Sequence, residues 1–431
     1  MNVRPLRLLA LLVLLASFAA ATAQEFDWRR FEGSEIRFMM NRHPFTNWLE
    51  PLVPEFEELT GIDVTLEVLP EDQFRQVRLL EVSSGAATLD GYMIMPGQVS
   101  AQYLGAGWVR YVDDLVADPS LNMPDLDLDD FFGGAIGTFR DGDRLFGLPL
   151  QIESSVLFYR EDLFEAAGLE GPPETMDELM AYAAELSGEM VAGFAMRGRG
   201  AAATSQIVNL LYSFGGEWLD EEGKSALDSP ESIAALTFYA DLLRNYGPPG
   251  PTNLHWAEVT SLYAQGQAAM IFDANVFRPI MEDPAQAIDI VRENTRYAPL
   301  PAGPAGSVPG VLVWGLSINH ASQNPEASWY FIQWALSKEN QVRLALFGVP
   351  AARGSAWANE EFRTRAPADW IEASMTSFER GQPYWNPPII PVAEVRDAYG
   401  QAIVAALEGR DVAQALERAA DEMDRIVERT R

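Results

Sequence analysis

The sequence predicts an α/β protein with more than one domain, and three observations lead to this fold class. Residues 35–104 alternate short apolar runs with amphipathic stretches, the pattern of strands and helices that follow one another around a largely parallel sheet. The chain has 431 residues, which is enough for two or more cores. Its hydrophobic fraction of 48% and mean hydropathy of −0.07 are those of an ordinary globular protein.

The elements of this first part follow from periodicity and turn residues. Apolar or alternating runs predict strands at residues 36–40, 62–69 and 89–95. Stretches with helical spacing predict helices at residues 49–59, 73–82 and 99–104.

The stretch from Gly147 to Leu169 departs from this pattern. An apolar segment is broken by Pro149 and by polar residues around Glu153, and a second apolar run covers residues 156–159. A helix follows and should end at Gly168, because glycine is a common C-terminal stop. A glutamate between two strand-like runs is not an ordinary surface residue. We therefore expect the chain to cross between two domains here, with Glu153 facing the space between them.

The rest of the chain continues in the same mixed pattern. We expect further strands at residues 191–196, 268–272 and 311–318. We expect helices at residues 176–186, 205–214, 230–243, 325–336 and 338–346, and two amphipathic helices from residue 395 to the end. Ser229 followed by Pro230 is a strong helix start.

Residues 1–23 predict a secretory signal peptide. Arg4 and Arg7 precede an apolar run, and Ala21-Thr22-Ala23 fits a cleavage site before Gln24. No other stretch approaches about 18 uninterrupted apolar residues, so we expect a soluble mature protein. Because the chain has no cysteine, it cannot carry a lipid anchor on that residue. An exported protein without an anchor is retained only behind an outer membrane, which favours the periplasm.

The charge and the missing cysteines exclude several classes of function. The chain has 62 acidic and 31 basic residues and a formal net charge of −31. Nucleic acid is therefore an unsuitable partner, because few cations could replace its counterions. Disulfides, thiolate metal sites and cysteine nucleophiles are excluded as well. We expect no cofactor.

Known catalytic and metal-binding patterns are mostly missing. The three histidines are far apart, and no H-E-x-x-H, G-x-S-x-G or Walker A sequence occurs. Residues 125–130 resemble a calcium loop, but Asp130 replaces its glycine and Ile136 its bidentate glutamate. Residues 198–203 fit a relaxed dinucleotide fingerprint, although a flexible loop, or arginines facing a polar ligand, explains them better. Paired carboxylates for glycoside hydrolysis stay open, because 62 acids offer many pairs.

Several tryptophans occur beside glycine, proline or asparagine in predicted loops. They are Trp48, Trp218, Trp314 and Trp385. Such an indole either fills the edge of a core, the commoner role, or offers a flat apolar face. A flat face suits the C–H surface of a sugar, while Asp, Glu, Asn, Gln and Arg bind its hydroxyl groups.

Motifs along the whole mature chain resemble one family. The first half contains FEELTGIDVTLEV, YLGAGWVRYVDDLV and FGLPLQIESSVLFYREDLFEAAGLEGPPETMDEL, and the second half contains YAQGQAAMIFDANVF, YAPLPAG, VWGLSINHASQNPEASWYFIQWALSKENQ and GVPAARGSA. Each is modest alone, but their order is specific. The chain resembles the extracellular solute-binding proteins of ABC sugar importers, which include maltose-binding protein. ESSVLFYR, AMRGRG, NYGPPGP and DANV make it most similar to members that bind mannitol or sorbitol.

The resemblance implies a periplasmic-binding-protein fold, in which two α/β lobes surround a ligand cleft and the chain crosses between them three times. The crossings would fall near residues 149–153, 310–314 and 350–354. The lobes would comprise residues 24–149 plus 313–352 and residues 153–310 plus 355–431. The function implied is capture of a sugar or sugar alcohol and delivery to the permease subunits in the inner membrane, by a monomer without enzymatic activity.

The resemblance also implies ligand contacts. His43 lies at the family's first cleft loop, Gln98 lies where the family often has a carboxylate, and Glu153 matches a hinge glutamate that binds sugar. The complete set of candidates is His43, Gln98, Gln151, Glu153, Arg197, Arg199, Asp273, Trp314, Arg353 and Trp385. Of these, Arg197, Arg199, Asp273 and Glu153 would bind hydroxyl groups, and Trp314 or Trp385 would pack on the carbon chain.

Two departures from the family favour a small ligand. Maltose binders have a stacking tryptophan where this chain has residues 273–277, and Met95 replaces an aromatic residue of oligosaccharide binders. Three alternatives stay open: another cargo such as a phosphorylated polyol or an oligosaccharide, service to a sensor, and an exported glycan-active enzyme.

Overall fold

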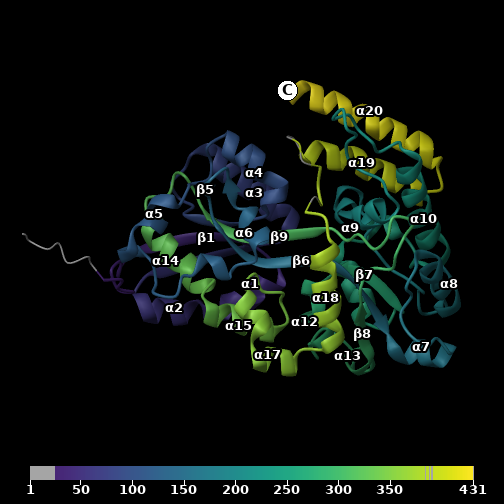
Figure 1. Ribbon diagram of the computed structural model, residues 1–431, viewed down its shortest axis with the longest axis horizontal. Helices are drawn as coiled ribbons and strands as arrows, with labels where there is room; N and C mark the ends of the chain where they lie inside the picture. Colours follow the sequence, from purple (N-terminus) through teal and green to yellow (C-terminus); the bar gives the residue numbers. More distant parts are fainter. Residues whose placement is uncertain (1–24, 384, 388, 390–391, 431) are drawn as a thin grey trace, which may run out of the picture.

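The computed structural model describes residues 25–383, 385–387, 389 and 392–430, so the predicted signal peptide lies outside the described residues. Figure 1 shows two bodies side by side, with long strands crossing the middle. We call these bodies the first and second lobes. No helix in the described part of the chain is long and apolar enough to cross a membrane.

The first lobe contains the start of the chain. Strand β1 (Glu35–Asn41) pairs in parallel with β2 (Asp63–Leu69) and with β3 (Gly91–Ile94). Its other elements are α1 (Pro44–Leu49), α2 (Val53–Thr60), α3 (Glu71–Ser84), α4 (Pro96–Gly105), α5 (Asp113–Ala117), α6 (Gly133–Gly137), β4 (Arg140–Asp141), β5 (Arg144–Leu145), α14 (Pro325–Ala335) and α15 (Lys338–Phe347). The predicted helix at 49–59 is divided between α1 and α2 around two prolines, Pro51 and Pro54.

The second lobe is mainly helical. Its strands β7 (Met270–Ala274) and β8 (Thr295–Ala298) are short. Its helices are α7 (Glu161–Ala167), α8 (Met176–Leu186), α9 (Gly200–Ser213), α10 (Pro230–Tyr246), α11 (Trp256–Ala264), α12 (Arg278–Glu282), α13 (Asp289–Asn294), α18 (Ala368–Arg380), α19 (Val392–Leu407) and α20 (Val412–Thr430). Ser229 caps α10, and Gly168 ends α7 at φ 75°, both as predicted.

Two strands join the lobes. Strand β6 (Leu148–Arg160) pairs with β9 (Val311–Ile318) as far as Ser154, and with β7 from Ser155 onward. The sheet order is β2-β1-β3-β9-β6-β7, and β8 also pairs with β6. We predicted two apolar runs with a break; the structure has one continuous strand, with only a register shift between Pro149 and Gln151.

A third crossing lies beside these strands. Ala351 forms a bridge with Gln151, and the backbone nitrogen of Ile152 donates to the carbonyl oxygen of Pro350 over 3.1 Å. The chain then continues through α16 (Gly354–Ala358) and α17 (Glu360–Arg365) to α18, which contacts β6 and β8. The lobe boundaries given above stay a prediction.

The largely parallel sheet predicted for residues 35–104 is present, because β1 pairs in parallel with β2 and β3. The other named strands of the described chain pair antiparallel, including β6 and β9 between the lobes. One expectation about the strands needs correction. The strand expected at residues 191–196 is reduced to isolated bridges from Ala192 and Ala195 to residues 268 and 271.

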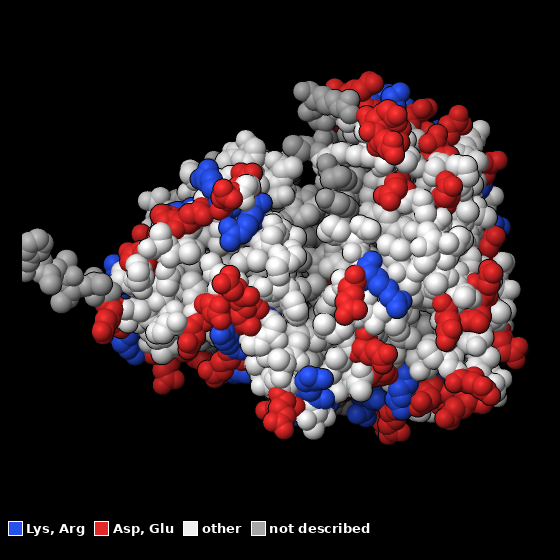
Figure 2. Space-filling model, viewed as in Figure 1, with Lys and Arg blue, Asp and Glu red and all other residues white. Residues whose placement is uncertain are grey.

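The acidic composition lies on the surface. Figure 2 shows acidic side chains spread over this face, with fewer basic side chains between them. One group of acidic side chains lies at the upper right, where Figure 1 places α19 and α20. This agrees with a role of the charge in solubility.

Candidate ligand-binding site

A small cavity lies between the lobes, on one face of the crossing strands, and opens into a wider cleft. Successive side chains of a strand point to opposite faces, so Gln151 and Glu153 share a face that Ile152 does not. Glu153 pairs with Leu312 and Gln151 with Trp314, and Glu153, Leu312 and Trp314 line the cavity. Its volume is about 40 Å³, room for roughly three water molecules.

Glu153 lies in a buried polar group at the centre of this face. His43, at the start of α1, places Nε2 3.2 Å from Glu153 Oε1. Gln151 Nε2 donates to the same carboxylate oxygen, and lies 3.5 Å from His43 Nδ1. All three side chains are buried, so the sequence-based expectation for Glu153 agrees with its position.

Helices α3 and α4 supply a charged wall from the first lobe. Arg75 Nε donates to Glu71 Oε1 over 3.1 Å, and Arg75 Nη1 donates to Gln98 Oε1. The Arg75 guanidinium lies 5.8 Å from the centroid of the Trp314 ring. Burial raises the pKa of Glu71, but the positive charge of Arg75 outweighs this and holds the pKa well below its ordinary value. Glu71 is therefore ionised.

An ion pair from the second lobe forms another part of the cavity wall. Arg197 Nε donates to Asp273 Oδ2 over 2.9 Å, and Nη2 donates to the other carboxylate oxygen. Arg197 Nη1 donates to Ser205 Oγ over 3.1 Å. Burial lowers the pKa of Arg197, but Asp273 outweighs this and raises it. Asp273 is fully buried behind Arg197, so it orients the arginine and does not line the cavity.

Aromatic rings form the remaining walls. Trp256 stacks on Phe277, with centroids 5.0 Å apart and planes at 9°. Trp385 packs against the backbone of Gly310, where a Cβ atom would lie 1.8 Å from the indole Cδ1, so only glycine fits. His255, beside Trp256, has a pKa lowered to about 3 by burial and by Arg197, which keeps it neutral at pH 7.

Side chains of the two lobes bind each other across the cleft. Trp256 Nε1 donates to Glu71 Oε2 over 3.1 Å, and Arg199 Nη2 lies 3.1 Å from Asp72 Oδ2. The cavity continues outward into a cleft of about 400 Å³ between α3, α4, α9 and α19. The lobes are therefore closed over the inner cavity, with an outer cleft next to it.

The family model described as bacterial extracellular solute-binding protein matches residues 43–342. The chain belongs to this family. This solute-binding protein is 27% identical over 347 residues to the erythritol/L-threitol-binding protein of Mycolicibacterium smegmatis, covering 76% of this chain and 71% of the relative. It is 28% identical over 363 residues to the mannitol-binding protein of Pseudomonas aeruginosa, covering 80% and 79%.

Solved structures of other solute-binding proteins have the same fold. An ABC transporter solute-binding protein of Agrobacterium radiobacter in complex with ribitol superimposes with a TM-score of 0.83 at 28% identity, covering 91% of this chain and 99% of that one. One from Agrobacterium vitis with bound D-mannitol has a TM-score of 0.81 at 26% identity, covering 92% and 99%. The periplasmic-binding-protein fold predicted from the sequence is confirmed.

The structure brings most of the predicted site residues of this solute-binding protein together. His43, Gln98, Glu153, Arg197, Trp314 and Trp385 line the cavity. Gln151 and Asp273 contact those residues from behind. Arg199 lies at the cleft edge, exposed and paired with Asp72.

Arg353 lies away from the cavity. Its guanidinium donates to the main-chain oxygens of Leu336, Asp127 and Leu126 over 2.7–2.8 Å, and lies 3.8 Å from the centroid of the Phe131 ring. Because main-chain oxygens of the first lobe already accept from the N–H groups of this guanidinium, we leave Arg353 out of the site that we propose.

Sequence reasoning missed about two thirds of the cavity wall. The missed residues are Glu71, Arg75, Met95, Ala202, Ser205, His255, Trp256, Phe277, Leu312, Asn386 and Arg396. Glu71 and Arg75 are four residues apart on a helix, which in a sequence looks like an ordinary surface ion pair. His255-Trp256 before a helix was the one available signal for the second lobe.

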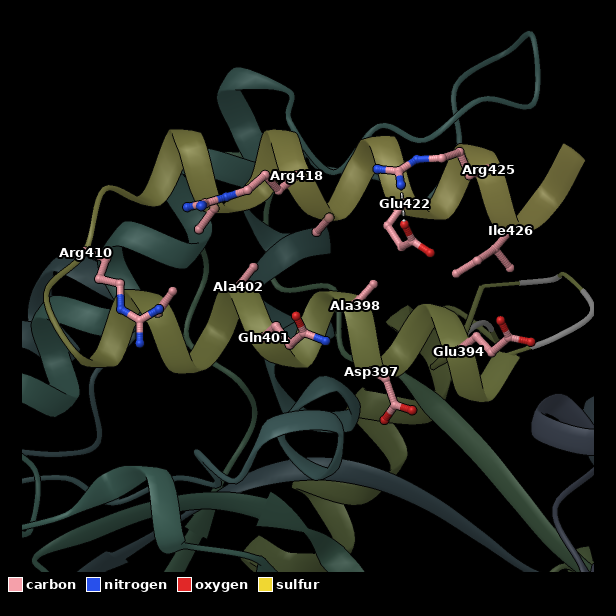
Figure 3. A pocket seen from close by; sticks show the side chains of 13 residues that line it. Glu394, Asp397, Ala398, Gln401, Ala402, Arg410, Arg418, Glu422, Arg425 and Ile426 are labelled. Carbon is pink, nitrogen blue, oxygen red and sulfur yellow. Dashed lines mark ion pairs between the residues drawn. The ribbon is translucent and has the colours of Figure 1, made fainter.

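Two other cavities of this solute-binding protein do not share these properties. Figure 3 shows a groove of about 530 Å³ between α19 and α20, in which Arg425 pairs with Glu422 over 2.8 Å. It lies within one lobe and its charges are exposed. A cavity of about 500 Å³ lies on the opposite face of the crossing strands, lined by apolar side chains such as Ile152, Val311 and Val313. It offers few groups that could bind hydroxyls.

Proposed function

We propose that this solute-binding protein captures a small sugar alcohol or sugar between its lobes in the periplasm, and delivers it as a monomer to the permease of an ABC transporter. The observation that carries the proposal is the inner cavity, to which both lobes contribute charged and polar side chains around indole faces. Relatives and solved structures named for erythritol, mannitol and ribitol support the ligand class.

The balance of charge favours a neutral ligand. Arg75 is paired with Glu71, and Arg197 with Asp273. The third arginine of the wall, Arg396, is held by Thr204 Oγ1 and the carbonyl oxygen of Ala201. Burial lowers the pKa of Arg396 to about 10, so its guanidinium stays charged at neutral pH. Its positive charge balances the negative charge of Glu153 in the net charge of the wall. A phosphorylated polyol would bring about two negative charges to a site in which the carboxylates of Glu71, Asp273 and Glu153 already balance the three arginines.

The chemistry of the wall fits a polyol. Carboxylates accept hydrogen bonds from hydroxyl groups, guanidinium groups donate to them, and both are present on opposite sides of the cavity. The rings of Trp314, Trp256 and Phe277 offer apolar faces to a carbon chain. The inner cavity of about 40 Å³ is far too small for an oligosaccharide, and a ligand of one sugar unit would extend from it into the adjoining cleft.

The mechanism needs binding alone. A ligand that contacts Arg75 from the first lobe, Arg197 from the second and Glu153 in the crossing between them interacts with both lobes only when they are closed. Its binding energy therefore shifts the equilibrium between open and closed forms toward the closed one. The closed form would then dock on the permease. No bond of the ligand is made or broken.

Isothermal titration calorimetry on the mature protein tests this function. The panel comprises erythritol, ribitol, mannitol, sorbitol, glucose, maltose and mannitol 1-phosphate. We expect saturable 1:1 binding of at least one unphosphorylated polyol or monosaccharide, and the ligand recovered unchanged. Binding of the phosphorylated compound alone, binding of maltose alone, or release of a product would each overturn the proposal.

A further inference from the structure

Helix α9 carries a stripe of polar side chains that is buried, contrary to the usual pattern of a surface helix. Gln206, Asn209 and Ser213 follow one another at helical spacing, and each is fully buried. The N-terminal part of the helix, at Ala202 and Ser205, lines the ligand cavity. A buried polar stripe needs partners to offset its desolvation, and these partners lie in the interlobe crossings.

Asn209 binds two of the three crossings at once. Its Oδ1 accepts from the backbone nitrogen of Gly310 over 2.7 Å, directly before β9. Its Nδ2 donates to Ser155 Oγ over 3.0 Å, at the point where β6 changes partner from β9 to β7. Ser154 Oγ in turn donates to the carbonyl oxygen of Gly310 over 3.1 Å. One side chain therefore fixes both strands to the second lobe.

The same network extends to the ligand cavity. Ser155 Oγ donates to Gln206 Oε1 over 2.8 Å, and Gln206 Nε2 donates to Asp273 Oδ1 over 3.1 Å. Asp273 holds Arg197, which lines the cavity. Ser155, Gln206, Asn209 and Asp273 have no exposed surface. The chain of contacts from the crossings to the cavity arginine is thus continuous and dry.

We propose that Asn209 is a positioning residue that clamps the β6 and β9 crossings to the second lobe and, through Gln206 and Asp273, keeps Arg197 in register with them. The lobes then bend on the first-lobe side of Ser154, and Arg197 moves with the hinge as one body. Because this chain of hydrogen bonds is continuous, a ligand that binds Arg197 is coupled directly to the crossings. This inference rests on the proposed function only for the binding of ligand, since the clamp itself is a property of the ligand-free protein.

The test measures lobe separation and ligand affinity separately. Because the chain has no cysteine, Leu80→Cys in α3 and Glu417→Cys in α20 give unique sites for spin labels, and both positions are exposed. We expect Asn209→Leu to broaden the distribution of distances between the labels in the ligand-free protein. We also expect it to weaken binding of the best ligand of the panel about tenfold, the scale for loss of buried hydrogen bonds.

Ser213→Ala is the matched control. Ser213 lies on the same face of α9, but its hydroxyl accepts from the backbone nitrogen of Val308, two residues before Gly310, and not from either contact of Asn209. We expect the control to lower thermal stability and leave the distance distribution unchanged. If Asn209→Leu does not fold, Asn209→Ser serves instead, because its side chain is too short to reach both strands.

The proposal is overturned if the folded Asn209 variant keeps the distance distribution of the parent, or if the control broadens it equally. The distance measurements require no ligand. Failure of the whole ligand panel would therefore count against the proposed function, while an unchanged distance distribution would count against the clamp.

Discussion

The indole nitrogen of Trp256 donates a hydrogen bond to the Glu71 carboxylate across the cleft, over 3.1 Å. Glu71 begins α3 in the first lobe, whereas Trp256 begins α11 in the second. The bond therefore exists only while the lobes are closed. It stabilises the closed form and leaves the fold of either lobe independent of it.

Trp256→Phe tests this bond. The substitution keeps the ring that stacks on Phe277 and removes the N–H donor. A hydrogen bond to a charged group contributes about 1.5–3 kcal/mol, so we expect ligand affinity to fall roughly tenfold or more, with the melting temperature of the ligand-free protein nearly unchanged. Calorimetry and thermal melts measure the two quantities. Trp108→Phe, outside the cavity, is the control and should alter neither, and equal affinity for the Trp256 variant and the parent would contradict the role of this bond.

Glu153→Ala should weaken ligand binding strongly and leave the fold nearly intact. The carboxylate lies in the cavity between His43 and Gln151, and we expect it to accept hydrogen bonds from ligand hydroxyls. Loss of a charged acceptor from a dry site should weaken binding by about 100-fold, given roughly 1.5–3 kcal/mol for each bond. Calorimetry and circular dichroism measure affinity and folding. A variant that unfolds yet retains affinity would show that Glu153 is structural.

Arg353→Met should have the opposite effect. The guanidinium donates to three main-chain oxygens of the first lobe, two of them in buried bonds, and each unsatisfied buried group costs about 1–3 kcal/mol. We expect the free energy of unfolding in urea to fall by about 3 kcal/mol or more, with affinity unchanged at a temperature where the variant is folded. If the Arg353 variant loses ligand affinity but keeps the stability of the parent, Arg353 takes part in ligand binding after all.

The unfolding free energy should fall as the pH decreases from about 6.5 toward 3. The pKa of His255 is lowered from 6.5 to about 3 in the fold, chiefly by burial. Between these values the unfolded chain binds a proton that the folded chain does not, so acid favours unfolding. The pKa of Glu71 is also depressed, and its contribution, full above about 4.5, is lost as the pH falls further.

Urea titrations at several pH values check the contribution of His255. His255→Gln should have a shallower dependence on pH between 6.5 and 3 than the parent. His320→Gln is the matched control, because His320 is exposed and should leave the slope unchanged. A His255 variant with the parental slope would contradict the assignment.

Sequence patterns predicted those parts of the site that local chemistry marks. Glu153 is polar within an apolar run, and a charge in such a place requires a partner or a function, so its position was predictable. The bounds of strand β6 were harder to predict, because a proline within an apolar run usually indicates the end of a strand. In the structure the strand continues past Pro149 with a shift in register.

The remaining site residues depend on contacts that no local pattern contains. Glu71 and Trp256 are 185 positions apart, and nothing near either residue indicates that they meet. Arg353 and Arg197 are both candidate ligand contacts from the sequence. Only the fold shows that main-chain oxygens hold one, while Asp273 turns the other toward the cavity.

Three of the 11 tryptophans, Trp256, Trp314 and Trp385, line the cavity. Each indole has a neighbour that affects its emission: the Glu71 carboxylate at Trp256, the Arg75 guanidinium over Trp314, and the backbone of Gly310 under Trp385. Opening of the lobes takes Trp256 away from Glu71 and admits water to all three rings. The protein thus carries its own optical reporter of occupancy, and intrinsic fluorescence can follow ligand exchange in real time without a label.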